Sequence, residues 1–355
     1  MRLYDPVLYP FALLYDGITR LRNRLFDIGS KKSVEFTIPT IVVGNLSIGG
    51  TGKTPMIEFL IEKLIGQHRL ATLSRGYGRK TSGVILAGDD ASASTIGDES
   101  FQIYTKYGDR LLVAVGEERI QAIPEIILER PETEVVLLDD AYQHRYLKSD
   151  FNILLTTYQK PFYKDKIIPL GTLREHRRGA SRADVVIMTK CPRGMSAAMK
   201  NVAKAEISKY TQENCPVFFA SVKYGAPYGV SPSAIEDLGN VILLSGIANN
   251  EVLLQYVKEK YNVLEILEYP DHYRYGEKDI QKILQTYDAQ LSNSPVILTT
   301  EKDMVKLKDG KFDNYLKEIP IFALPVMVDL NHEDEDRLMG MISVTIREKG
   351  YKSEL

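Results

Sequence analysis

A glycine-rich segment that follows an apolar run carries the residues best suited to chemistry in this chain. The apolar run covers residues 38–43, and the segment after it reads GNLSIGGTGKTP. Glycines let backbone N–H groups curl around phosphate oxygens, a lysine adds positive charge, and a threonine hydroxyl can ligate Mg²⁺. The strict pattern G-x-x-x-x-G-K-[ST] has glycine where this chain has Ser47, so an ordinary strand-to-helix turn is the alternative. We predict a nucleotide-phosphate loop that consists of Ser47, Ile48, Gly49, Gly50, Thr51, Gly52, Lys53 and Thr54.

Two adjacent carboxylates end a second apolar run. Residues 135–138 are valines and leucines, and Asp139 and Asp140 follow them directly. A carboxylate at the tip of such a strand can hold a metal ion or its water opposite the loop threonine, Thr54. The run alone is weak evidence, but together with an upstream phosphate loop it predicts a Mg²⁺ site.

Another acidic pair, Asp98 and Glu99, stands in the segment IGDESF just before a stretch of helical periodicity. Acidic residues at this position commonly complement the helix dipole. They can also accept a proton from an attacking hydroxyl group or help to hold a metal ion. The residues alone leave both interpretations open.

Basic and aromatic residues follow other predicted strands. Arg75 and Tyr77 lie in the turn SRGYGRK, at the strand end where open α/β sheets bind ligands, although a solvated basic loop is an equal alternative. Arg119 follows the strand RLLVAV, and Glu175 lies in an arginine-rich loop. His272 lies in the strand-to-helix turn DHYRYGEKD, where helix capping is the alternative to catalysis.

The elements that must position these residues alternate between apolar runs and segments of helical periodicity. This alternation predicts an α/β fold of the P-loop NTPase type, with a largely parallel sheet and helices on both faces, plus a second, smaller α/β domain. We predict an amphipathic helix over residues 1–30, a phosphate-loop domain over 31–220, a linker over 221–239 and the smaller domain over 240–355. In the second half, residues 241–249, 296–308 and 321–330 are predicted as strands.

The N-terminal segment is apolar and then basic. Residues 7–15 are interrupted by Pro10 and fall short of the roughly 20 residues that a spanning helix needs. The next residues place apolar side chains at helical spacing with arginines between them. Such a segment lies in a membrane interface or packs on the protein's own core.

Composition excludes several classes of protein. The chain has 355 residues, of which 44% are hydrophobic and 26% charged, so it is a globular protein with ample core material. A net charge of −2 gives no reason to expect nucleic-acid binding. With 2 cysteines, the sequence supports neither a disulfide framework nor a cysteine-rich zinc site, and it fits a reducing compartment.

Taken together, the motifs resemble one family, the tetraacyldisaccharide 4'-kinases of lipid A biosynthesis. The resemblance covers about residues 1–310. Ser or Thr at the position of Ser47 is usual in that family, whereas Ser100, Ala141 and Tyr142 depart from its common residues. The matching segments, in chain order, are VGNLSIGGTGKTP, SRGYGRK, GDES, DDAYQHR, PLGTLREHRRGASRADVVIMTKC, DHYRY and TTEKDMVKL.

The resemblance implies transfer of the γ-phosphoryl group of ATP, with Mg²⁺, to the 4'-hydroxyl group of a tetraacylated glucosamine disaccharide 1-phosphate. It implies a peripheral protein on the cytoplasmic face of the bacterial inner membrane, and it favours membrane contact by the N-terminal helix. We further expect a monomer.

The resemblance also implies roles for single residues. Lys53 would neutralise phosphate charge, and Asp98 would be the base, oriented by His272. The other matches are Thr54, Asp139, Asp140 and Glu99 around the metal, and Arg75, Tyr77, Arg119 and Glu175 around the acceptor or the transferring phosphate.

Two functions of other kinds compete with this one. A membrane-surface ATPase that positions partners would share the phosphate loop, but such proteins often carry an additional lysine early in the loop, which is absent here. A soluble small-molecule kinase would have no need of the amphipathic N-terminus.

Overall fold

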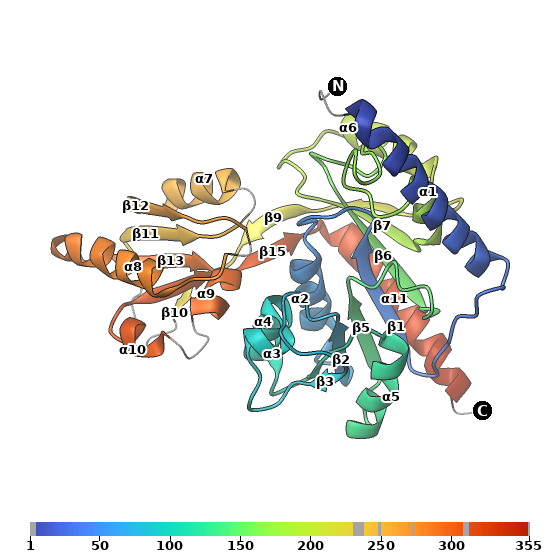
Figure 1. Cartoon of the computed structure of the whole chain (residues 1–355), viewed down its shortest axis with the longest axis horizontal. Coiled ribbons are helices and arrows are strands. Elements are labelled where there is room, and N and C mark those ends of the chain that lie inside the picture. Colours follow the sequence, from blue (N-terminus) through green and yellow to red (C-terminus); the bar gives the residue numbers. More distant parts are fainter. Residues whose placement is uncertain (1–4, 230–237, 248–249, 272, 308–311, 354–355) are drawn as a thin grey trace.

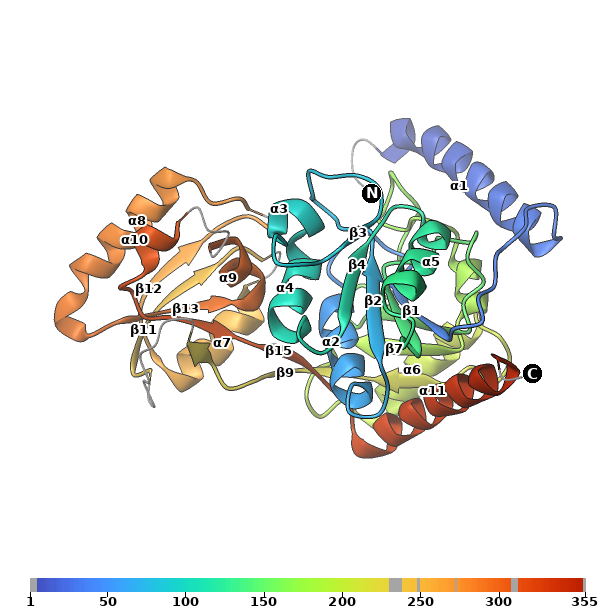
Figure 2. The same cartoon turned by 90° about the horizontal axis from the view of Figure 1, so that it is seen from below.

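The computed structural model describes residues 5–229, 238–247, 250–271, 273–307 and 312–353. Within these residues the chain forms two α/β bodies joined by a pair of strands (Figure 1). The larger body holds both termini of the described chain, and the smaller body projects from it (Figure 2). The predicted fold class, a largely parallel sheet with helices on both faces and a second, smaller α/β unit, is confirmed.

The larger body is built on a sheet whose described strands number eight, in the order β3-β4-β2-β5-β1-β6-β7-β8. Every neighbouring pair is parallel except β3 with β4. Strand β1 lies between β5 and β6, with buried residues along its whole length. The strands are β1 (Thr40–Asn45), β2 (Leu70–Ser74), β3 (Ile85–Leu86), β4 (Leu112–Val115), β5 (Val135–Asp139), β6 (Phe151–Thr157), β7 (Val185–Thr189) and β8 (Val217–Phe219).

Helices cover both faces of this sheet because each helix has an apolar stripe that it must bury. The helices α2, α4 and α11 contribute to one buried cluster, and α5, α6 and η1 contribute to the other. The helices are α2 (Lys53–Leu64), α3 (Ala93–Ile96), α4 (Asp98–Tyr107), α5 (Arg119–Glu129), η1 (Arg177–Arg182), α6 (Ala197–Ser208) and α11 (His332–Ser353).

The smaller body has a sheet in the order β10-β14-β13-β11-β12, with α8, α9 and α10 packed on one face and α7 on the other. Strand β10 is antiparallel to β14, and the other pairs are parallel. The elements are β10 (Tyr228–Gly229), β11 (Asn240–Ser245), α7 (Glu251–Lys260), β12 (Asn262–Glu268), α8 (Glu277–Ala289), η2 (Leu291–Asn293), β13 (Val296–Thr300), α9 (Glu301–Leu307), α10 (Asp313–Leu316) and β14 (Ile321–Leu324).

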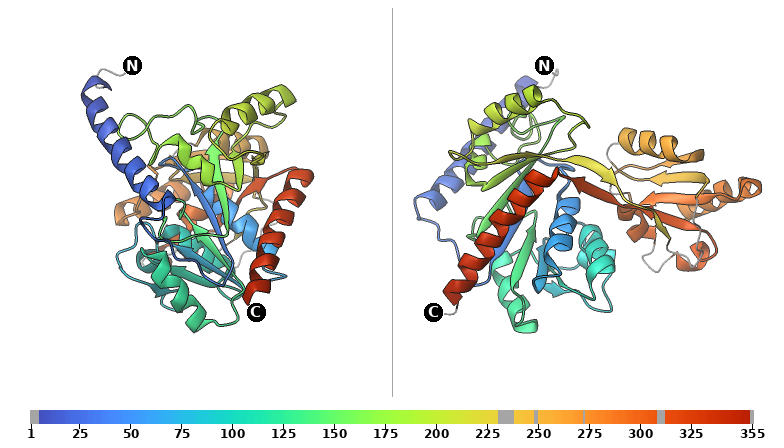
Figure 3. Two further views of the ribbon diagram at one scale, coloured as in Figure 1. Left: turned by 90° about the vertical axis from the view of Figure 1, so that its right-hand side faces the viewer. Right: turned by 180° about the vertical axis from the view of Figure 1, so that it is seen from behind.

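The chain leaves the larger body along β9 (Ser221–Tyr224) and returns along β15 (Val326–Asp329), and these two strands pair antiparallel. Helix α11 then lies against the large sheet, as Figure 3 shows, with Leu338 and Ile342 fully buried. The sequence prediction assigned residues 240–355 to the smaller domain. The structure instead returns the C-terminal helix to the larger body, because its apolar residues pack with α2 and α4 in the buried cluster on one face of the large sheet.

Three predicted strands have different boundaries in the structure. The segment 241–249 is the strand β11, which ends at Ser245, and residues 248–249 lie outside the described residues. The segment 296–308 is a strand only to Thr300, and α9 begins at Glu301. The Asp303 side chain accepts a hydrogen bond from the Thr300 hydroxyl, and the Asp303 N–H donates to that hydroxyl, which stabilises the first turn of the helix. The segment 321–330 is split at Pro325 into β14 and β15, because proline cannot donate a ladder hydrogen bond.

Helix α1 (Asp5–Asp27) lies along the outside of the larger body. Its inner face is fixed by polar contacts and by a few buried residues, among them Ala12 and Phe26. No helix in the described part of the chain is both long and apolar enough to cross a membrane.

Candidate active site

Several predicted site residues lie at the carboxyl edge of the large sheet. The parallel strands β1, β2, β4 and β5 end at this edge, and they are followed by the phosphate loop, the Arg75–Tyr77 turn, Arg119 and Asp140, respectively. Open α/β sheets bind ligands in the crevice outside these strand ends.

The phosphate loop runs from the end of β1 to the start of α2. Gly49 (φ 120°) and Gly52 (φ 86°) adopt conformations that disfavour other residues, so the glycines at these positions are required by the turn. The loop is braced from behind, since Asn45 Nδ2 donates to Thr51 Oγ1 at 2.8 Å and Thr189 Oγ1 donates to the Thr51 carbonyl at 2.8 Å. Helix α2 begins at Lys53 without a side-chain cap, so its first N–H groups face the loop. This arrangement suits a phosphate group.

Lys53 points toward Asp140. The distance from Lys53 Nζ to Asp140 Oδ1 is 3.7 Å. Arg174 Nη1 lies 3.0 Å and 2.9 Å from the two carboxylate oxygens of Asp140. Asp140 has a left-handed backbone (φ 50°), which turns its side chain away from the strand that Asp139 ends. Both cations therefore flank the position where the loop would hold phosphates.

Asp139 is buried, and its Oδ1 atom has no hydrogen-bond partner in the described part of the chain. Burial and, next, the charge of Glu99 raise the pKa of Asp139 to about 7, against the opposing effect of Lys53. An orphaned, buried carboxylate oxygen next to a phosphate loop is costly without a cation. The structure thus places Glu99, from α4, close enough to Asp139 to act on it.

Arg119 is the first residue of α5 and is also buried. Its guanidinium group donates to the carbonyls of Gly116 and Glu117 at 2.9 Å and 3.0 Å. Burial lowers its pKa to about 10, while Asp139 and Asp140 oppose that shift. Arg119 is therefore held rigidly near the acidic pair.

Asp98 is the first residue of α4, and the preceding Gly97 adopts φ 87°. A side chain at Gly97 would clash with the backbone of the Arg75–Tyr77 turn, at 2.7 Å from the Tyr77 carbonyl oxygen. The Ser74 and Ser100 hydroxyls are hydrogen-bonded at 2.7 Å and join the same turn to α4. Ser100, which departs from the family pattern, thus has a local partner.

Arg75 and Tyr77 are exposed, and the Tyr77 side chain is 72% exposed. Across from them, Arg274 of the smaller body donates to the Gly78 carbonyl at 2.7 Å. The turn that contains Arg274 therefore faces the Arg75–Tyr77 turn. His272 lies outside the described residues, so its predicted pairing with Asp98 stays a prediction.

Glu175 is fully buried at the centre of a polar cluster. Arg182 donates to both of its oxygens at 2.7 Å and 3.0 Å, Asn23 of α1 donates at 2.7 Å, and Gln143 donates at 3.0 Å. The Gln143 amide also donates to the Asn45 carbonyl at the base of the phosphate loop. Glu175 thus links α1 to the loop, and the predicted contact of Glu175 with substrate stays a prediction.

Arg174 lies in the arginine-rich loop for which the sequence leaves phosphate binding and a solvated surface loop as alternatives, and only the fold shows that it reaches Asp140. Lys190 has no predicted site role. Lys190 has a left-handed backbone (φ 54°) at the end of β7, and a methyl group added at Gly50 would lie 3.9 Å from Lys190 Nζ. The predicted strand over residues 183–191 includes Lys190, so its periodicity contained no signal of a site role.

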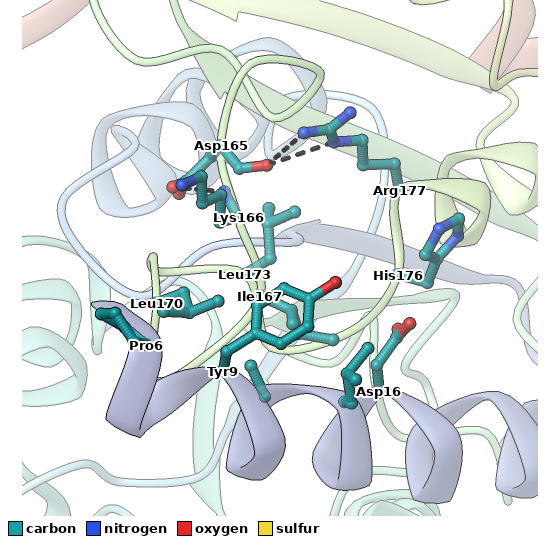
Figure 4. Close-up of a pocket in the computed structure, with 12 residues that line it drawn as sticks. Pro6, Tyr9, Asp16, Asp165, Lys166, Ile167, Leu170, Leu173, His176 and Arg177 are labelled. Atoms are coloured by element: carbon teal, nitrogen blue, oxygen red, sulfur yellow. Dashed lines mark hydrogen bonds between the residues drawn. The ribbon is translucent and has the colours of Figure 1, made fainter. Parts of the chain in front are cut away.

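An apolar pocket of about 640 Å³ lies between α1 and residues 165–177. Figure 4 shows Pro6 and Tyr9 of α1 facing Leu170 and Ile167. Charged groups stand at its border, where Arg177 donates to the Asp165 carbonyl. The pocket is lined by Pro6, Tyr9, Ala12, Leu13, Asp16, Asp165, Lys166, Ile167, Leu170, Leu173, His176 and Arg177.

The parallel sheet, the glycine loop that opens α2 and the acidic pair at the end of β5 define a P-loop protein of the phosphotransferase class. Comparison with known proteins narrows this class. The family described as tetraacyldisaccharide-1-P 4'-kinase matches residues 4–344, and the chain belongs to this family.

Individual relatives agree with this assignment. The tetraacyldisaccharide 4'-kinase of Flavobacterium johnsoniae is 42% identical over 328 residues, with 90% of this chain and 93% of the relative covered. The enzyme of the same name from Bacteroides fragilis is 36% identical, with 98% and 95% covered. The crystal structure of LpxK from Aquifex aeolicus in complex with ATP is similar with a TM-score of 0.74 and 28% identity, and 96% of this chain and 99% of that chain are covered.

Proposed function

We propose that this chain is an ATP-dependent kinase that phosphorylates the 4'-hydroxyl group of a tetraacylated glucosamine disaccharide 1-phosphate in lipid A biosynthesis. The observation that carries the proposal is the family match over residues 4–344, and it is supported by a phosphate loop that follows β1, the strand paired with the one that Asp139 ends. The sequence alternatives, a membrane-surface ATPase and a soluble small-molecule kinase, share the loop but lack the family match.

The donor set of the site fits Mg²⁺. The ion prefers oxygen ligands and is usually held by one or two carboxylates together with substrate phosphates. The unpartnered oxygen of Asp139, the Asp140 carboxylate, Glu99 and the Thr54 hydroxyl supply such oxygens. When bound, Mg²⁺ neutralises charge that develops on the phosphate oxygens. The residues that would hold it are Thr54, Asp139, Asp140 and Glu99.

The residues of the chain then perform positioning and charge neutralisation, which are most of what phosphoryl transfer requires. Backbone N–H groups of residues 47–54 bind the phosphates, and Lys53 exchanges its contact with Asp140 for phosphate oxygens. Asp98, at the start of α4, accepts the proton of the acceptor hydroxyl, with His272 as its partner. The role of Asp98 and His272 rests on the family resemblance and on the position of α4.

Recognition of the acceptor is assigned to the Arg75–Tyr77 turn, where the two bodies contact each other through Arg274. Arg75 and Tyr77 are exposed on the turn that Arg274 contacts, so a sugar or its phosphate can reach them. Arg119 and Glu175 lie deeper and act on the transferring phosphate or the acceptor through their buried charges. The pocket beneath α1 is mainly apolar and suits an acyl chain.

The outer face of α1 supports a peripheral location on the cytoplasmic face of the inner membrane. Phe11 and Leu14 are 61% and 64% exposed, and Val7 and Leu21 are exposed to a similar extent. An amphipathic helix of this kind lies in the headgroup region with its apolar residues inserted. We further propose that the protein acts as a monomer.

The function is tested with purified protein, Mg²⁺, ATP and the tetraacylated disaccharide 1-phosphate in detergent. We expect a product that carries one additional phosphate group, detected by mass spectrometry. ATP hydrolysis that is equal with and without the lipid, with no phosphorylated lipid, would contradict the kinase and favour the ATPase.

The membrane location is tested with Phe11→Asp and Leu14→Asp together. A charge on the inserted face opposes burial in the headgroup region, so we expect a large loss of co-sedimentation with vesicles of anionic phospholipid. Val202→Asp, on an equally exposed apolar residue of α6, is the matched control. Equal binding by both variants would return α1 to a purely structural role.

A further inference from the structure

Helices α2, α4 and α9 meet at a buried group of charged and polar side chains that the proposed function does not use. We name Glu58, Gln102, Lys106 and Glu301 the carboxylate–lysine junction. Lys106 Nζ lies 2.5 Å from Glu58 Oε2 and 2.8 Å from Glu301 Oε1. Gln102 Nε2 donates to Glu58 Oε1 at 2.7 Å and to Glu301 Oε2 at 3.4 Å. The junction therefore joins the larger body to the smaller one.

Three of the four side chains of the junction are buried, and the Lys106 side chain is 20% exposed. Glu58, Gln102 and Glu301 are 6%, 8% and 4% exposed. Burial alone would lower the pKa of Lys106, but the charges of Glu58 and Glu301 outweigh it and raise that pKa, so the lysine is cationic. Removal of one partner from such a group leaves buried charge uncompensated, which is strongly unfavourable. The relative position of the three helices is thus fixed by electrostatics as well as by packing.

The helical repeat connects this junction to the site. Asp98, Gln102 and Lys106 are spaced by four residues along α4, so they share one face of the helix. Thr54 and Glu58 are spaced in the same way along α2. The helix faces that carry the proposed base and the proposed metal ligand are therefore the faces that meet at the junction.

The smaller body contributes Glu301 to the junction. Glu301 is the first residue of α9, directly after β13, and it also accepts a hydrogen bond from the Tyr228 hydroxyl at 3.0 Å. Beside the junction, a pocket of about 260 Å³ separates part of α2 from the linker strand β15. Packing between the bodies is incomplete there, so the polar contacts of the junction carry much of the alignment.

We propose that Gln102 and Lys106 are positioning residues that act through Glu58 and Glu301 to hold Asp98 at its working distance from the phosphate loop and the smaller body. This inference rests on the proposed function, because it requires Asp98 to act as the catalytic base. A displacement of about 1 Å in a reacting group can cost on the order of 10²-fold in rate.

The test is a double-mutant cycle with Lys106→Met and Asp98→Ala, measured as kcat for lipid phosphorylation and KM for ATP. We expect Lys106→Met to lower kcat by about 10- to 100-fold with little change in KM for ATP. In the Asp98→Ala background the same substitution should have almost no further effect, because no base remains to be positioned. Lys209→Met, which removes an exposed lysine paired with Glu206 on α6, is the matched control and should retain full activity.

A second variant separates positioning from loss of the fold. Glu301→Gln keeps the side-chain shape but removes the ionic link between the bodies. We expect a smaller loss of kcat, again absent in the Asp98→Ala background, at a temperature well below the melting point of every variant. Lys106→Arg should restore much of the rate, since it keeps the charge.

The outcomes distinguish the inference from the function on which it rests. Losses that multiply with Asp98→Ala, or a rise in KM for ATP that accounts for the effect, would overturn the positioning role alone. Full turnover by Asp98→Ala would overturn the base and the positioning role together. Absence of lipid phosphorylation by the wild-type protein would overturn the proposed function itself.

Discussion

Neighbouring carboxylates in the site are held in different ways. Asp139 ends β5 in a buried position with an unpartnered oxygen, whereas Asp140 turns through a left-handed backbone to meet Lys53 and Arg174. The Asp139 carboxylate therefore has an oxygen available for a cation, whereas the charge of the Asp140 carboxylate is neutralised by two side chains. A bound nucleotide would compete with Asp140 for Lys53, which would release the Asp140 carboxylate to join Asp139 at the metal.

Asp139→Asn tests the proposed role of Asp139 in binding Mg²⁺. The amide keeps the shape of the side chain but removes the charge that attracts Mg²⁺, so we expect kcat to fall on the order of 10²-fold and the Mg²⁺ requirement to rise. Turnover as a function of Mg²⁺ concentration measures both effects, with the exposed Asp288→Asn as control. An unchanged Mg²⁺ titration would remove Asp139 from the metal site.

Glu58 makes stability depend on pH. Burial and, next, the charge of Glu301 raise the pKa of Glu58 from 4.5 to about 7 in the folded protein. The folded state therefore binds this proton more tightly than the unfolded state, and the stability that Glu58 contributes is complete below pH 4.5 and is lost as the pH rises through about 7.

The corresponding measurement compares Glu58→Gln with the wild-type protein by denaturant unfolding from pH 5 to pH 8. The glutamine has no charge to bury, so we expect the stability of the variant relative to wild type to increase over this range, by on the order of 1–3 kcal/mol. Parallel stability curves would show that Glu58 titrates normally in the folded protein.

Among the elements, α11 has the most unexpected position. It follows the smaller body in the chain but packs on the large sheet beside α2, with Leu338 and Ile342 in the same buried cluster as Ile41 of β1. The phosphate loop is thus supported by a strand that the last helix of the chain helps to cover.

Leu338→Ala should destabilise the larger body. The leucine is fully buried, and removal of such a side chain leaves a cavity and typically costs about 2–5 kcal/mol. Val344→Ala on the same helix is the control, because Val344 is 41% exposed, and we expect a change within about 0.5 kcal/mol. Equal effects in thermal unfolding would show that α11 does not belong to the core.

The whole molecule is two bodies joined by β9 and β15 (Figure 1). Two polar contacts connect the bodies in addition to the linker strands. One is the carboxylate–lysine junction, and the other is the hydrogen bond from Arg274 to the Gly78 carbonyl. The junction contacts are buried and align the bodies, whereas the contact of Arg274 with Gly78 is exposed.

Arg274→Ala tests the contribution of the exposed contact. It removes a hydrogen bond that holds the Arg75–Tyr77 turn against the smaller body, so we expect kcat/KM for the lipid to fall by about 3- to 10-fold with little change in melting temperature. Lys282→Ala, at an exposed position of α8, serves as control. A loss confined to thermal stability would show that the contact has no part in acceptor binding.

The sequence by itself determined the features that depend on residues close together in the chain, which are the secondary-structure elements and the short motifs. The phosphate loop, the strands that precede Asp139 and Arg75, and the helical N-terminus follow from spacing and periodicity, which depend on neighbours within a few residues. The fold class follows in turn, because alternating strands and helices have few ways to bury their apolar faces. The family resemblance came from the same segments.

Only the tertiary structure decided which distant residues meet. Nothing in the spacing indicates that Arg174 reaches Asp140, that Glu175 joins α1 to Gln143, or that Lys106 lies between Glu58 and Glu301. The packing of α11 on the large sheet could not be predicted either. An amphipathic pattern predicts that one face of a helix is buried, but it does not indicate which element packs against that face. Contacts between distant residues depend on how the elements of the whole chain pack around the core. The partner of a buried charged side chain is therefore determined by the tertiary packing.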